Sequence, residues 1–123
     1  MTIQELYEQI GGNYDHALQI MRMDKMISKY LLKLTDSGVC AKLREAGESM
    51  DPAALFESAH AMKGVCANLG LDDLAAAVGE VTEEFRPGAV RKLSDDEVRA
   101  KLDEIYAMYG KTETGINTYR ETL

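Results

Sequence analysis

The chain has 123 residues, the size of one compact domain, so we expect a single domain with one core over residues 1–123. Its formal net charge of −7 is opposite in sign to the surface that nucleic acid needs, and it equally disfavours an anionic membrane surface. No apolar run approaches the roughly 20 residues of a membrane-spanning helix, and the N-terminus lacks the pattern of a secretion signal, so a cytoplasmic protein is expected.

Two short helices are predicted at the N-terminus. Thr2 and Glu5 have the spacing of a capping box, and Gly11 follows the helix that they begin. Asn13 can cap a second short helix that runs to Met21. Two prolines and no tryptophan, in a chain rich in Ala, Leu, Glu and Lys, favour helix over sheet throughout.

Four longer amphipathic segments follow. The first runs from Asp24, a candidate N-cap, to about Ala46, and Gly38 predicts a bend or irregularity within it. The others are predicted over residues 51–69, over residues 72–85, and from residue 94 towards the C-terminus, each with apolar residues at helical spacing.

Each of these elements has an apolar stripe to bury, and no stretch alternates as a strand does. Four such helices joined by short turns predict an all-α fold, an antiparallel up-down-up-down four-helix bundle. The two short N-terminal helices are expected to cover one end or side of the bundle. Gly110 and Gly115 each weaken the last helix by about 1 kcal/mol relative to Ala.

The helix predicted over residues 51–69 has the most unusual surface in the sequence. Its apolar residues cluster on one side and predict a core stripe: Leu55, Ala59, Met62, Cys66 and Leu69. His60 falls on the order of 140° from the centre of that stripe, so its side chain is expected in solvent. Around it we expect an aromatic ring, a cation and small residues rather than the usual charged surface: Phe56, Lys63, Gly64, Ala53 and Ala67.

This face suits a nucleophile that receives phosphate from another protein. A neutral imidazole is a good nucleophile near neutral pH, without burial or an adjacent base. Lys63 can offset phosphate charge, and Gly64, which weakens the helix by about 1 kcal/mol relative to Ala, leaves room for close approach. A flat, partly apolar patch around a histidine is typical of a docking surface, with Ala53, Phe56 and Ala67 as docking residues.

The stretch HAMKGVCANLG, which begins at His60, resembles the signature of bacterial histidine phosphotransfer (HPt) domains. In that family an H-x-L-K-G core is followed by small residues, often by Asn-Leu-Gly, and then by an L-x-x-L-like segment, which residues 71–74 fit. Met62 stands where the family usually has leucine, a departure that leaves the chemistry intact. The resemblance spans roughly residues 10–90.

The resemblance implies that His60 takes a phosphoryl group, on Nε2, from a receiver-domain aspartyl phosphate and passes it to another receiver. Lys63 would support the phosphoimidazole, and Gly64 would leave room for the receiver's active site. The implied partners are response-regulator receiver domains, with a hybrid sensor histidine kinase as a further candidate. The divalent metal of such a transfer belongs to the receiver, so no cofactor or metal is expected here, and no autonomous ATP-dependent kinase activity.

Three other functions compete with this one. A binding-only module would dock a receiver without taking phosphate. A di-metal bundle enzyme needs inward Glu-x-x-His pairs from facing helices; Glu57 and His60 have the spacing, but both are predicted to point outward and no second pair occurs. An ATP-using kinase lacks support because the sequence has no glycine-rich phosphate loop or kinase signature.

The other histidine and the two cysteines have simpler interpretations. His16 lies near the start of a short helix, with Asp15 beside it and no lysine–glycine pair downstream, which favours a surface or capping role. Cys40 and Cys66 lack metal-ligand spacing and are expected to be reduced thiols at core or surface positions.

Overall fold

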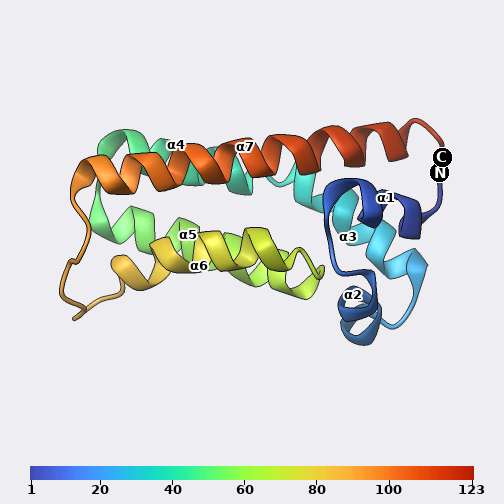
Figure 1. Ribbon diagram of the computed structural model, residues 1–123, viewed down its shortest axis with the longest axis horizontal. Helices are drawn as coiled ribbons and strands as arrows, with labels where there is room; N and C mark the ends of the chain where they lie inside the picture. The colour runs from blue at the N-terminus through green and yellow to red at the C-terminus, as the bar shows by residue number, and fades with distance from the viewer.

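The computed structural model describes all 123 residues and contains seven α-helices and no strand, so the predicted all-α class is confirmed (Figure 1). The capping box of Thr2 with Glu5 and the N-cap of Asn13 are both present. None of the helices combines the length and the apolar character that a membrane span needs. The helices are α1 (Ile3–Ile10), α2 (Tyr14–Met21), α3 (Asp24–Asp36), α4 (Val39–Ser49), α5 (Pro52–Asn68), α6 (Asp72–Glu84) and α7 (Asp95–Arg120).

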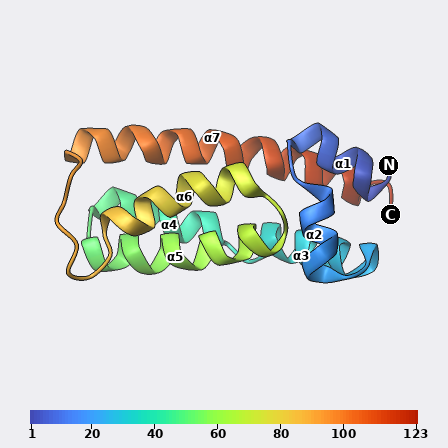
Figure 2. The ribbon, with the colours of Figure 1, turned by 60° about the horizontal axis from the view of Figure 1, so that its bottom comes forward.

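Helices α4, α5, α6 and α7 form the predicted antiparallel bundle, in which successive helices run in opposite directions (Figures 1 and 2). Each helix packs on the next, most extensively α5 on α6, and α7 closes the bundle against α4. One apolar core runs through the bundle and holds fully buried side chains from all four helices, among them Leu43, Leu55, Val78 and Ile105.

The irregularity predicted at Gly38 is a complete break between two helices. Gly38 has φ of +70°, a left-handed conformation that glycine adopts without steric cost. Helix α3 therefore ends before it and packs against α2 and α7 at one end of the bundle, while α4 continues within the bundle. The prediction of Asp24 as an N-cap is wrong: Met23 occupies that position without a side-chain hydrogen bond, and Asp24 instead accepts a hydrogen bond from the Tyr14 hydroxyl.

The last helix, α7, is continuous for 26 residues, and its C-terminal part packs against α1. Gly115 is buried at this contact, where a β-carbon would lie 2.4 Å from Ile10 Cγ2. The glycine that weakens the isolated helix therefore permits α1 to approach α7 closely. The two chain termini lie together at this end of the molecule, and the α6–α7 loop lies at the opposite end (Figures 1 and 2).

Helix α5 is fixed at both of its ends. At the N-terminus, Asp51 caps the helix by accepting a hydrogen bond from the Ala53 N–H, and Pro52 takes the first helical position, both as predicted. Just past the C-terminus, the Leu69 carbonyl accepts a hydrogen bond of 2.6 Å from the buried Tyr7 hydroxyl. This hydrogen bond satisfies a carbonyl at the end of α5 and joins that end to α1.

Candidate functional site

His60 lies on the solvent-facing side of α5. The five residues of the predicted stripe, Leu55, Ala59, Met62, Cys66 and Leu69, are all buried. The side chain of His60, one position after the fully buried Ala59, is exposed. Its imidazole forms no hydrogen bond or ion pair within the chain, in contrast to that of His16. Both ring nitrogens of His60 are therefore open to an incoming partner.

An aromatic ring and two small residues share this face of α5. Phe56, one turn before His60, is half-buried, and its ring centroid lies 5.4 Å from that of the imidazole with the planes tilted by 32°. Ala53 is exposed and Ala67 is half-buried. The predicted docking residues are thus all on the histidine side of α5, and Phe56 is in direct contact with the histidine.

Lys63 lies one turn after His60 and is half-buried against α6. A β-carbon at Gly79 of α6 would lie 3.4 Å from Lys63 Cε and 3.5 Å from Cδ, so the aliphatic stem crosses the α6 backbone at this glycine. Lys63 forms no ion pair, although Glu80 and Glu83 line the same groove of about 800 Å³. Its ammonium group therefore has no anionic partner within the chain.

Gly64 leaves the middle of this face open. The residue is exposed, and a β-carbon there would meet no atom within 4 Å. Nothing inside the chain therefore requires glycine at this position. Since glycine in a helix costs about 1 kcal/mol relative to alanine, its presence fits close approach by another molecule to the α5 backbone.

The last turn of α6 and the residues just after it supply two further charged residues to the site, Glu83 and Arg86. Arg86 donates two hydrogen bonds to Glu83, and its guanidinium carbon lies 5.4 Å from the centroid of the Phe56 ring. The hydrogen bonds from Arg86 lower the pKa of Glu83, with smaller contributions of the same sign from the nearby Lys63 and His60. A Glu-x-x-Arg spacing before Pro87 was the only signal in the sequence, and it does not reveal which helix face the pair meets.

The other histidine has a structural partner. His16 Nδ1 lies 2.7 Å from Asp72 Oδ1, and Asn13 Nδ2 donates to the other oxygen of the same carboxylate. These contacts join the start of α2 to the first turn of α6. The predicted surface or capping role of His16 is thus realised as a link between two helix N-termini.

Both cysteines are buried free thiols. Burial raises the pKa of Cys66 to about 12, which keeps this thiol protonated and unreactive. No three side chains of the types His, Cys, Asp and Glu are grouped so that they could hold a metal ion. Glu57, which has Glu-x-x-His spacing with His60, is exposed on α5 as predicted.

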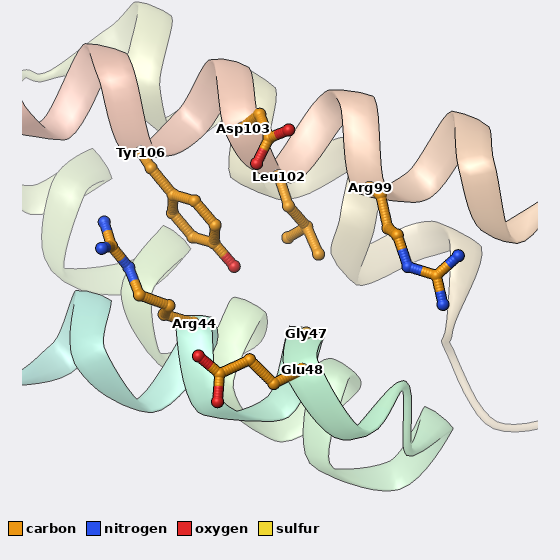
Figure 3. Close-up of a pocket in the computed structure, with 7 residues that line it drawn as sticks. All are labelled: Arg44, Gly47, Glu48, Arg99, Leu102, Asp103 and Tyr106. Carbon is orange, nitrogen blue, oxygen red and sulfur yellow. The ribbon is translucent and has the colours of Figure 1, made fainter.

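A second hollow of about 580 Å³ lies between α4 and α7 (Figure 3). Arg44 from α4 lies over the ring of Tyr106 from α7, 4.6 Å from its centroid, and Arg99 lies towards the other end (Figure 3). Glu48 and Asp103 balance the two positive charges. The hollow contains no histidine, and its charges cancel, so its walls do not provide the nucleophile and cation that the His60 face combines.

The chain matches one protein family. The model of the family described as Hpt domain matches residues 31–109, which contain α4, α5 and α6 and more than half of α7. No curated protein and no solved structure matches the chain.

Proposed function

Because the chain belongs to the Hpt domain family, we propose that it relays a phosphoryl group between receiver-domain aspartates and carries that group on His60. Members of this family are histidine phosphotransfer modules of two-component signalling rather than kinases, and they interact with receiver domains and histidine kinases. To this family-level function the proposal adds three points: the relay itself, the residue that carries the phosphoryl group, and the receiver partners of this chain.

One observation carries the proposal. The chain has two histidines, and His60 is the one within residues 31–109, which match the family. It is exposed, its ring nitrogens are unpaired, and Lys63, which forms no ion pair, and the open Gly64 follow it by one turn of α5. His16 lies outside the matched residues, and an aspartate engages its ring.

The proposed transfer needs few groups from this chain. The lone pair of His60 Nε2 attacks phosphorus, an N–P bond forms, and the P–O bond of the aspartyl phosphate breaks so that the carboxylate leaves with its electron pair. The proton on Nδ1 stays in place. Such a transfer passes through a loose transition state, so it depends mainly on alignment and on stabilisation of charge.

The neighbouring residues have distinct proposed roles. Lys63 offsets the charge of the phosphoryl group, and Gly64 lets the receiver approach the α5 backbone. Ala53, Phe56 and Ala67 form the surrounding surface on which a receiver docks. The divalent metal of the transfer is assigned to the receiver, and none to this chain.

The test is transfer of radiolabelled phosphate from a phosphorylated receiver domain to the full chain. We expect a label that is labile in acid and stable in base, that is lost in His60→Gln, and that persists in His16→Gln. The His16→Gln variant is the matched control because it removes the only other imidazole. The result that contradicts the proposal is no label with any receiver of the source genome, or a label that survives His60→Gln. Binding of a receiver that is unchanged by His60→Gln, without transfer of label, supports the binding-only module instead.

A further inference from the structure

Three successive contacts connect the end of α6 to the imidazole on α5. Glu83 accepts hydrogen bonds of 2.9 Å from Arg86 Nε and 2.8 Å from Arg86 Nη2. The Arg86 guanidinium lies 5.4 Å from the centroid of the Phe56 ring. The Phe56 ring in turn lies 5.4 Å from the His60 ring, within the range of an aromatic pair. The exposed nucleophile thus has one aromatic neighbour, and that neighbour has one cation.

The residues beside Arg86 hold the end of α6 in a fixed position. Phe85 is buried in the core. Glu84 is also buried and accepts hydrogen bonds from Arg91 Nε and from the backbone N–H groups of Lys92 and Leu93, which fastens the following loop to α6. Arg86 therefore reaches the Phe56 ring from an anchored backbone rather than from a free loop.

We propose that Phe56 is a positioning residue for His60 and that the Glu83–Arg86 pair holds Phe56 in place. This inference rests on the proposed function, in which the rate depends on alignment of Nε2 with the incoming phosphorus. An exposed imidazole turns about two side-chain bonds, and few of its orientations are productive. A ring against the imidazole limits that rotation, and a guanidinium on the ring limits the rotation of the ring itself.

The same pair also controls the charge around the imidazole. Glu83 is close enough to Lys63 and His60 for their charges to act on its carboxylate. An unpaired carboxylate at this place would attract the ammonium and repel a phosphoryl group. Arg86 binds both oxygens of Glu83, and Lys63, which lines the same groove, forms no ion pair.

Two measurements on the full chain test the proposal. The first is the NMR chemical shifts of the His60 ring protons in the unphosphorylated protein, which respond to the ring current of Phe56. The second is the rate of transfer from a phosphorylated receiver. The variants are Phe56→Leu, Phe56→Tyr and Arg86→Met. Arg44→Met is the matched control, since it removes a comparable contact of a guanidinium with a ring in the α4–α7 hollow (Figure 3).

We expect Phe56→Leu to remove the ring-current shift and to slow transfer about tenfold, and Phe56→Tyr to restore both. Arg86→Met should reduce the shift and slow transfer about two- to fivefold, the factor that a cation–π contact at an exposed site supports. Arg44→Met should change neither. Circular dichroism establishes that each variant is folded.

Two results would overturn the inference: ring-proton shifts that are the same in folded Phe56→Leu as in the unaltered chain, or altered shifts with an unaltered transfer rate. Failure of the proposed function looks different. In that case the unaltered chain accepts no phosphate at all, while the chemical shifts still report whether Phe56 and Arg86 restrain the His60 ring.

Discussion

The stem of Lys63 crosses the backbone of α6 at Gly79, where a β-carbon would stand 3.4 Å from Lys63 Cε. Lys63 belongs to α5 and Gly79 is buried in α6, so the contact joins the two helices that pack most extensively on each other. A lone β-carbon there would make ordinary van der Waals contact with the stem, whereas a larger side chain would obstruct it. The course of the Lys63 side chain therefore depends on Gly79, which lies 16 positions after Lys63 in the chain.

Replacement of Gly79 by valine should displace the Lys63 side chain while leaving the bundle folded. The valine side chain would meet the flexible aliphatic stem of Lys63 rather than backbone atoms. We expect Gly79→Val to slow phosphoryl transfer towards the level of Lys63→Met. That level is about ten- to hundredfold below the unaltered chain, the factor for a hydrogen bond to a charged group. Transfer rates of both single variants and the double variant check this. Additive losses in the double variant would show that Gly79 does not act through Lys63.

Substitution of Gly64 by alanine should stabilise the fold and at the same time slow phosphoryl transfer. Gly64 and Gly110 both lie inside helices with no atom within 4 Å of an added β-carbon. Each Gly→Ala change should therefore raise the free energy of unfolding by about 1 kcal/mol. Only Gly64→Ala should slow transfer from a receiver, and Gly64→Leu should slow it further. Thermal unfolding and transfer rates measure the two effects, and equal transfer by all these variants would remove the proposed clearance role.

Glu84 should make the stability of the fold depend on pH. Burial alone would raise the pKa of its carboxyl, but the hydrogen bonds from Leu93, Arg91 and Lys92 outweigh it and hold the pKa below the ordinary value of 4.5. The carboxylate therefore stabilises the fold above the pKa of the unfolded chain, and this contribution is lost as the pH falls through the lower folded pKa.

At neutral pH we expect Glu84→Gln to lower the free energy of unfolding by about 1–3 kcal/mol. Urea denaturation of both proteins between pH 7 and pH 3 should show this difference shrinking below about pH 4.5. The control is Glu80→Gln, which removes an exposed carboxylate paired with Lys101 and should have a much smaller effect. A difference that grows on acidification contradicts the assignment.

Removal of the Tyr7 hydroxyl should loosen the join between α1 and α5. Tyr7→Phe leaves the Leu69 carbonyl without its buried donor and should cost about 1–2 kcal/mol of unfolding free energy. Tyr14→Phe is the matched control, because the hydroxyl of Tyr14 donates to Asp24 at the surface and its loss should cost less. Urea denaturation of the two variants compares the costs, and equal costs would mean that burial of the Tyr7 bond adds nothing.

The features that depend on helical periodicity could be predicted from the sequence. Spacing alone predicts the buried stripe that contains Leu55 and Met62, and the same geometry predicts the exposed side of α5. Gly38 signalled an irregularity, but the sequence did not distinguish a bend from a break, because that depends on how α3 packs against α2 and α7. The N-cap prediction at Asp24 is wrong for a similar reason, because the Asp24 carboxylate accepts a hydrogen bond from Tyr14 of another helix.

The contributions of α6 to the site could not be predicted in this way. Gly79 and Arg86 reach the His60 face only because α6 lies against α5 in one particular register. A single sequence gives each helix its own buried and exposed sides, but it does not give the rotation and offset of one helix against its neighbour. For a site formed by two helices, the pattern of each helix therefore predicts only the residues that this helix contributes.

The two chain ends emerge side by side where α1 packs on the last turns of α7, and neither projects over α5 or α6 (Figures 1 and 2). A fluorophore or a surface-immobilisation tag at either terminus would consequently leave both helices uncovered. Association and dissociation of a receiver could then be recorded in real time with the protein tethered through one of its termini. Joining the two ends through a short linker and reopening the chain at the α6–α7 loop would yield a circular permutant with the same bundle.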